Sequence, residues 1–388
     1  MEQQPTFYYF LGSFENIPDP RKPYNQKHRF LDIITITILA TLCGADTWNE
    51  IAEWGKANLD WLLTFLPLEN GIPSHDTFNR VFQLISPEEF HRAFRTWVQS
   101  IASELEGVIA IDGKTIRGSR EAVSNTRPSH IVSAWAQEQG LVLGQLKVEE
   151  KTNEITAIPE LLKTLAIKGC IVTIDAMGTQ KEIAKQICDS EADYILSLKE
   201  NQGTLYQEVS EYFEKGLFTE SKTELEKSGK YYKTLCQDHG RIEKREYYLE
   251  SEIDWMVDAR KDWPSLGAIG ACRSRVEKPD GKISEYTRYM ILSSADMTVQ
   301  TFGDSQRSHW GIENSLHWCL DIAFQEDQSR MRNKNEAENM NLIRHMCLNM
   351  LKRDKSVNIG LKSKRKKCGW DKNYLFRILQ TLDTTSFE

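Results

Sequence analysis

Three acidic residues stand where their carboxylates could meet: Asp112, Asp175 and Glu313. Asp112 and Asp175 each end a short apolar run rich in β-branched residues, which predicts two buried strands. A carboxylate at the carboxyl end of a central strand points into the crevice where open α/β sheets bind ligands. Glu313 lies in a stretch whose apolar residues recur at helical spacing, so we expect it on a helix. These three carboxylates could share divalent metal.

The chemistry of such a site follows from its donor atoms. Hard cations such as Mg²⁺ or Mn²⁺ prefer carboxylate oxygens and keep several waters, so few protein ligands are needed. Two such ions about 4 Å apart clamp the attacking and leaving oxygens of an in-line phosphoryl displacement. The pattern therefore indicates two-metal nuclease or strand-transfer chemistry.

A different metal site competes on the same helix. His309, Glu313 and His317 share one helical face, and this is also a zinc-ligand spacing. The stretch lacks the His-Glu-x-x-His arrangement with its general base. We therefore expect the two histidines to contact DNA or to orient Glu313, and Asp321 is the second candidate for the third acid.

The stretches of sequence around the three acids resemble those of a known family. Residues 111–118, 173–180 and 309–318 are similar to the H-repeat-associated (ISAs-type) insertion-sequence transposases, a branch of the DDE transposases. The resemblance implies an α/β fold with a ribonuclease-H-like catalytic core. It also implies that the metal ligands of this core are Asp112, Asp175 and Glu313. Many related transposases carry a tyrosine, an arginine and a lysine around the glutamate; those offsets hold other residues here, namely Gln306, His309 and Leu320.

The elements that must position these residues can be read in order. Strands are predicted at 107–112, 130–137, 141–149, 170–175 and 193–199, with helices at 156–167 and from a capping box at Thr179. The order βββαβαβ is the one that the resemblance implies. Residues from about 201 to 300 read as a β-rich insertion, with a hairpin turn at Pro279-Asp280-Gly281.

A chain of 388 residues suits two domains plus an insertion. We expect an all-helical N-terminal DNA-binding domain at 1–105, the catalytic domain at 106–350 and a basic C-terminal segment at 351–388. Helix starts at Ser74 and Ser86 mark a unit that resembles a helix-turn-helix, although an ordinary packed bundle explains the same pattern. The second of these starts reads as a capping box completed by Glu89.

The formal net charge of −7 excludes DNA binding through bulk positive charge, so phosphate contacts must come from local basic residues. The candidates for these contacts are Lys114, Arg117, Lys199, Arg241, His309, Arg330 and Arg332. Arg241, Glu243 and Arg245 share one strand face, which either contacts DNA or forms a solvated salt-bridged strand. The run Lys362–Lys367 is either a phosphate-binding cluster or a solubilising tail.

Other features point to a soluble cytoplasmic protein. No secretory signal opens the chain, and the apolar run 31–45 is too short for a membrane span and predicts a buried helix. The eight cysteines are scattered and read as free thiols. The expected partner is DNA, as terminal inverted repeats and target, and the family's chemistry implies a homodimer in the DNA complex. A nuclease without strand transfer and a catalytically decayed DNA-binding relic remain the alternatives.

Overall fold

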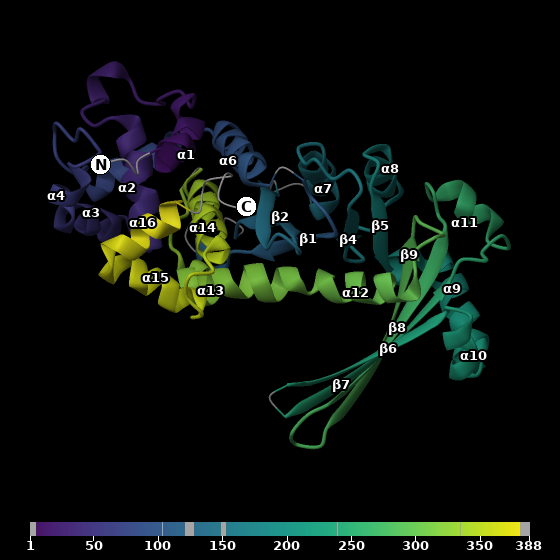
Figure 1. The fold of residues 1–388 in the computed structure, drawn as a ribbon. Helices are drawn as coiled ribbons and strands as arrows, with labels where there is room; N and C mark the ends of the chain where they lie inside the picture. Colours follow the sequence, from purple (N-terminus) through teal and green to yellow (C-terminus); the bar gives the residue numbers. More distant parts are fainter. Residues whose placement is uncertain are drawn as a thin grey trace.

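The structure is a computed structural model that describes residues 5–102, 104–120, 128–148, 153–238, 240–333 and 335–380. Its centre is one nine-stranded sheet in the order β3-β2-β1-β4-β5-β9-β8-β7-β6 (Figure 1). The strands are β1 (Val108–Thr115), β2 (His130–Ala136), β3 (Leu141–Lys147), β4 (Ile171–Ile174), β5 (Asp193–Leu198), β6 (Tyr231–Asp238), β7 (Arg241–Glu250), β8 (Ala268–Glu277) and β9 (Ile283–Leu292).

The first five strands match the predicted segments, although β1 continues past Asp112 to Thr115 and position 149 lies outside the described residues. β1 pairs parallel to β4, which pairs parallel to β5, while β2 and β3 are antiparallel. Ile111 pairs with Ile174 in the parallel register. Because parallel strands end at the same edge of a sheet, Asp112 and Asp175, each one residue further along, are neighbours.

Helices α7 (Glu154–Leu162) and α8 (Lys181–Asp189) connect these strands and pack on the sheet. The capping box predicted at Thr179 is wrong, because Gln180 occupies the N-cap position. The Thr179 hydroxyl instead donates to the carbonyl of Ser197 at 2.6 Å, which ties the start of α8 to β5. The local pattern therefore predicts the helix correctly but assigns its N-cap to the wrong residue.

The predicted β-rich insertion extends the central sheet instead of forming a separate one. β9 pairs antiparallel with β5, and β6 to β8 follow outward. The predicted hairpin turn joins β8 to β9, with Gly281 at φ +77°. Helices α9 (Gly203–Lys215), α10 (Lys222–Lys227) and α11 (Val257–Asp262) complete the insertion. Figure 1 shows the far ends of β6–β9 projecting from the body as a twisted ribbon.

The N-terminal region is helical, as predicted. It contains α1 (Pro5–Glu15), α2 (Phe30–Leu42), α3 (Trp48–Ala57), α4 (Leu59–Leu62), α5 (His75–Leu84) and α6 (Pro87–Ile101). Ser74 and Ser86 cap α5 and α6 by accepting backbone N–H groups. Only half of the predicted box at Ser86 forms, because the Glu89 carboxylate pairs with Arg92. α2 is buried, as expected of the run 31–45, and no described helix is long and apolar enough to cross a membrane.

The C-terminal helices join this N-terminal group (Figure 1). They are α14 (Glu336–Arg353), α15 (Leu361–Trp370) and α16 (Lys372–Gln380). α14 is buried along nearly its whole length between α2, α5, α6 and β3. The eight cysteines are free and mostly buried, as predicted.

The basic run 362–367 was predicted to be a solubilising tail or a phosphate-binding cluster, but two of its basic residues are buried and bonded inside the protein. Lys364 is buried and donates to the carbonyl of Leu351 at 3.1 Å. Arg365 is buried too, and its guanidinium donates to carbonyls at the end of α2 and in the following loop, Thr41 (2.7 Å) and Ala45 (2.9 Å), and to the Asp46 carboxylate (2.6 Å). Two of the six basic-run positions therefore satisfy internal groups that would otherwise be buried without partners.

Short 3₁₀ turns complete the secondary structure. They are η1 (Pro23–Asn25), η2 (Arg117–Ser119), η3 (Glu200–Gln202), η4 (Leu217–Thr219) and η6 (Glu326–Gln328).

Candidate metal centre

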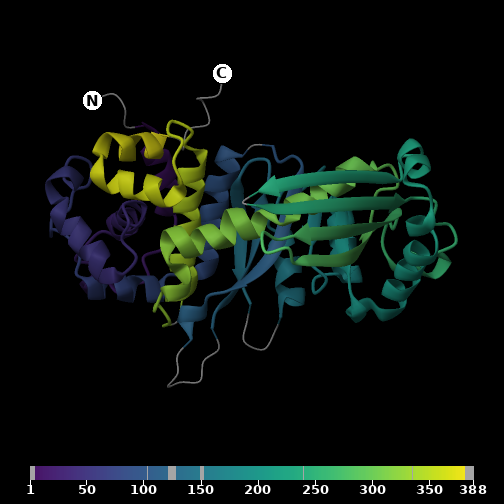
Figure 2. The same ribbon diagram turned by 90° about the horizontal axis from the view of Figure 1, so that it is seen from below.

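One long helical segment faces the carboxyl ends of β1 and β4. It begins as α12 (Val299–His309), passes through a π-helical turn η5 (Glu313–His317) and ends as α13 (Trp318–Phe324). Ile312, Leu316 and Leu320 are buried, as the predicted apolar face requires. Figure 2 shows this segment running along the sheet from the ribbon β6–β9 toward the N-terminal helices.

Asp112, Glu313 and His317 form a cluster whose candidate ligand atoms all lie within 4.8 Å of one another. His317 Nδ1 lies 3.7 Å from Asp112 Oδ2 and 3.5 Å from Glu313 Oε2. The π-helical turn widens the helix at this point, and such single turns occur frequently at functional sites. His317 is buried, and its Nε2 has no hydrogen-bond partner among the described residues.

Asp175 lies at the edge of this cluster without being one of its three members. Its Oδ1 accepts backbone N–H groups from Met177 at 3.0 Å and from Gly178 at 3.4 Å. Its negative charge nevertheless acts on Asp112, as the parallel register of β1 and β4 requires. The structure therefore places Asp112 and Glu313 in one cluster and Asp175 within electrostatic range of Asp112.

The electrostatics of the cluster fit a cation. The pKa of Asp112 is raised to about 7, chiefly by burial and with smaller contributions from the charges of Glu313 and Asp175, while His317 and the backbone N–H of Gly113 oppose the shift. The hydrogen bond from His317 lowers the pKa of Glu313. Carboxylates this close repel one another and favour a bound positive charge. The donor set of carboxylates and one imidazole suits Mg²⁺ or Mn²⁺.

His309 does not lie where a DNA contact or a zinc ligand was expected. Its Nδ1 is 3.0 Å from the Thr173 hydroxyl on β4, and its ring is partly buried. Burial lowers the pKa of His309, opposed by the charge of Asp175. The competing zinc set of His309, Glu313 and His317 is therefore not assembled within the described residues, and His309 packs the helix against β4.

Lys114 is not available for DNA phosphates. Its ammonium lies 2.8 Å from Asp321, 2.8 Å from Glu326 and 3.4 Å from Asp327, and its side chain is 11% exposed. This arrangement also removes Asp321 as a candidate third metal ligand, because its carboxylate is engaged by Lys114. Lys114 is held in this position because Glu326 is fully buried, and a buried carboxylate is costly unless a cation pairs with it.

The other phosphate-contact candidates are exposed but scattered. Arg117 is 85% exposed, and its guanidinium lies 3.5 Å from Asp327. Arg332 donates to the carbonyl of Gly118 at 3.0 Å, and Arg330 is exposed nearby. Lys199 lines a cavity beside Asp175, and Arg241 lies on the ribbon.

Sequence reasoning did not single out Arg307 or Trp310. Both lie within two turns before Glu313, and together with Arg241, Glu243 and Arg245 they line a second cavity. The signal in the sequence was their position on the Glu313 helix, six and three residues before Glu313. The fold that brings strand 241–250 against this helix was not visible in the sequence.

Comparison with known proteins agrees with this geometry. Residues 103–350 match a family model described as a transposase DDE domain, and residues 11–98 match one described as associated with that domain. The chain therefore belongs to the DDE transposase family.

Its relatives specify the branch. The chain is 40% identical over 374 residues to a putative transposase YncI of Escherichia coli O157:H7, covering 96% of this chain and 94% of that protein. It is 39% identical over 366 residues to the H repeat-associated putative transposase YhhI of Escherichia coli K12, covering 94% and 95%. Among solved structures, a piggyBac transposase synaptic complex with hairpin DNA aligns with a TM-score of 0.41 at 10% identity, covering 100% of this chain and 84% of that one.

Proposed function

We propose that this protein cuts DNA at the ends of an insertion sequence and joins the released 3′ end to target DNA. The observation that carries the proposal is the parallel register of β1 and β4, which sets Asp112 beside Asp175 with Glu313 and His317 facing them. The proposed core is ribonuclease-H-like: the order β3-β2-β1-β4-β5, with the first three strands antiparallel and the next two parallel, supports it.

In this proposal Asp112, Asp175 and Glu313 hold two Mg²⁺ or Mn²⁺ ions. Bound divalent ions supply Lewis acids for phosphodiester hydrolysis and transesterification. His317 lies between Asp112 and Glu313 and keeps their carboxylates turned toward each other. The N–H groups of Met177 and Gly178 fix the Oδ1 atom of Asp175. These contacts preorganise the acids before metal arrives.

DNA is the proposed partner, as terminal inverted repeats and as target. Arg117, Lys199, Arg241, Arg330 and Arg332 remain candidates for phosphate contacts because each is exposed. The helices of residues 1–105 are proposed to recognise the element's ends, in the bacterial cytoplasm and on the nucleoid. A homodimer is proposed because two ends must be brought together for joining.

The decisive experiment measures cleavage of a labelled duplex that carries the element's own terminal repeat, with Mg²⁺, with Mn²⁺ or with EDTA. We expect metal-dependent cuts at the element boundary that Asp112→Asn, Asp175→Asn and Glu313→Gln abolish while DNA binding is retained. Asp304→Asn is the matched control, because Asp304 is an exposed acid on α12.

The same assay separates the alternatives. Cuts unrelated to the repeat, without joining of a pre-cut end, would identify a plain nuclease. Specific binding without cuts under every metal would identify a catalytically decayed relic. Wild-type cleavage by the Asp175→Asn protein would contradict the assignment of the site.

A further inference from the structure

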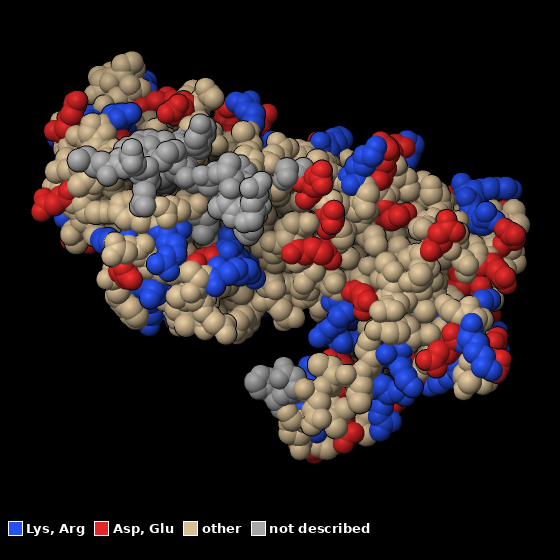
Figure 3. Space-filling model, viewed as in Figure 1, with Lys and Arg blue, Asp and Glu red and all other residues tan. Residues whose placement is uncertain are grey.

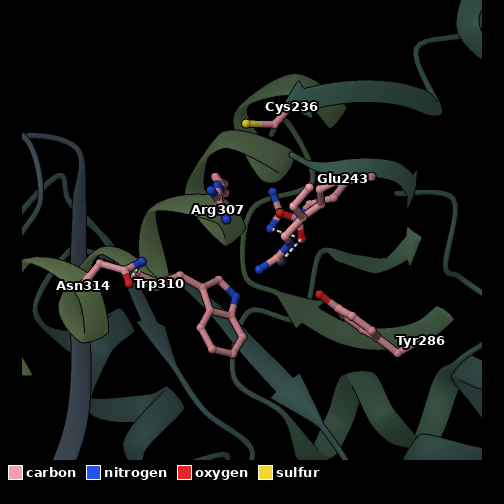
Figure 4. Close-up of a pocket in the computed structure, with 8 residues that line it drawn as sticks. Cys236, Glu243, Tyr286, Arg307, Trp310 and Asn314 are labelled. Carbon is pink, nitrogen blue, oxygen red and sulfur yellow. Dashed lines mark hydrogen bonds and ion pairs between the residues drawn. The ribbon is translucent and has the colours of Figure 1, made fainter. Parts of the chain in front are cut away.

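A cavity of about 700 Å³ lies between the ribbon and the helical segment that carries Glu313. Figure 3 shows the ribbon standing away from the body with a hollow between them. Figure 4 shows side chains from the ribbon and from this segment pointing toward each other across the cavity. The residues that line it are Cys236, Arg241, Glu243, Arg245, Tyr286, Arg307, Trp310 and Asn314.

The arginines of β7 are held in place by one buried carboxylate. Arg241, Glu243 and Arg245 alternate along β7 and therefore share a face. Glu243 lies 3.2 Å from Arg241 and 2.5 Å from Arg245, and both Glu243 and Arg245 are buried. Holding long side chains in one geometry before a ligand arrives lowers the entropy cost of binding it.

Positive charge exceeds negative charge around this cavity. Arg307 joins the two β7 arginines from the last turn of α12, and Glu243 is the one acid among the described residues that line the cavity. Because the chain as a whole carries a net charge of −7, this surplus is local. Guanidinium groups bind phosphate oxygens through paired N–H donors, so the cavity suits an anionic phosphodiester.

An aromatic contact joins the cavity to the metal centre. The guanidinium of Arg288 on β9 lies 4.6 Å from the ring centre of Tyr286 and 4.6 Å from that of Trp310. Trp310 is three residues before Glu313, directly after α12. Arg288 therefore links strand β9 of the ribbon to the residue that stands three positions before Glu313.

We propose that this cavity binds backbone phosphates of the DNA strand that enters the metal centre, and that Arg288 and Trp310 position Glu313 when the strand is bound. The inference rests on the proposed function and assigns part of its substrate to named residues. Arg241, Arg245 and Arg307 are the phosphate-binding residues. Arg288 and Trp310 are positioning residues.

The binding part is tested by fluorescence anisotropy of a labelled duplex with the terminal repeat, in EDTA and over a range of salt. Arg241→Gln and Arg307→Gln each remove an exposed guanidinium and leave the buried Glu243–Arg245 pair intact. We expect each to reduce the slope of log K against log salt by about one and to weaken binding about tenfold at 0.15 M salt.

Arg260→Gln is the matched control, because Arg260 is an exposed, ion-paired arginine of α11, at the other end of the insertion from the ribbon tips (Figure 1). Slopes and affinities of Arg241→Gln and Arg307→Gln equal to those of the control would overturn the binding part.

The positioning part is tested by steady-state cleavage. Trp310→Leu removes the ring, and we expect kcat to fall about tenfold while KM and DNA affinity stay within about twofold. Trp310→Phe keeps a ring for Arg288 and should recover most of the loss. An unchanged kcat in Trp310→Leu, or equal losses in both variants, would overturn this part.

These outcomes are distinct from failure of the proposed function. Loss of cleavage in Asp112→Asn with unchanged salt slopes in the arginine variants would leave the function standing and overturn the inference. Binding is measured without metal. If the wild-type chain does not cut DNA but Arg241→Gln and Arg307→Gln still reduce the salt slope, the phosphate-binding cavity is supported and the proposed enzyme activity is contradicted.

Discussion

At the level of single residues, His317 links two carboxylates that would otherwise repel each other. Its Nδ1 lies 3.5 Å from Glu313 and 3.7 Å from Asp112, from a buried position on the π-helical turn. Removing a group that orients metal ligands commonly costs about 10- to 100-fold in metal affinity or activity. The imidazole therefore belongs to the proposed metal centre, either as a ligand or as the group that holds the two acids.

We predict that His317→Ala raises the Mg²⁺ concentration needed for half-maximal cleavage about 10- to 100-fold. The reason is that Asp112 and Glu313 lose the contact that fixes their direction. Titrating cleavage rate against Mg²⁺ measures the effect, and Asp304→Asn, at an exposed acid on α12, is the control. A metal dependence identical to that of the wild type would show that His317 serves packing alone.

At the level of elements, a buried ion cluster fastens β1 to the segment after α13. Glu326 is fully buried, with Lys114 at 2.8 Å and Arg344 of α14 at 3.9 Å. The charges of Lys114 and Arg344 lower the pKa of Glu326 against the opposing effect of burial. Lys114 and Asp112 lie on the same strand, so this cluster ties the strand that carries Asp112 to the segment after α13.

We predict that Glu326→Gln lowers the free energy of unfolding by about 3 kcal/mol, because the buried Arg344 loses the carboxylate 3.9 Å away, while Lys114 keeps Asp321 and Asp327. Urea denaturation followed by circular dichroism measures the change. Glu53→Gln breaks an exposed pair with Lys56 and should cost less than about 1 kcal/mol. A loss at Glu326 no larger than at Glu53 would contradict the account.

Prediction from sequence succeeded where the cause is local. The strands that lead to Asp112 and Asp175, the caps at Ser74 and Ser86 and the apolar face of the Glu313 helix depend on residues within a few positions of one another. Lys114 was misread because its partners Asp321 and Glu326 lie more than two hundred positions away. Arg365 was misread for the same reason, since the carbonyls that it satisfies belong to residues near 41–45.

At the level of the whole molecule, segments from both ends of the described chain form one helical group. α14 packs against α2, α5 and α6 on one side and β3 on the other, and α1 contacts α16. The boundaries expected near residues 105 and 350 therefore do not separate independent cores. Instead, the N-terminal helices share their core with residues 336–380.

We predict that a fragment of residues 1–105 does not fold alone and that the full chain unfolds in one transition. Without α14 and α15, the fragment would expose the apolar faces of α2, α5 and α6 and lose the Arg365 contacts at the end of α2. A proton–nitrogen NMR spectrum of the fragment and a urea titration of the full chain test this. Dispersed fragment signals, or two separate transitions, would contradict it.

The same packing has a consequence for protein synthesis. A ribosome-bound chain that has emerged as far as residue 335 already contains Asp112, Asp175 and Glu313, but it lacks α14, which fills the space between the N-terminal helices and β3. The N-terminal helices therefore cannot close around their core during most of translation. A nascent or prematurely terminated product would therefore carry Asp112, Asp175 and Glu313 without the helix that completes the scaffold around them.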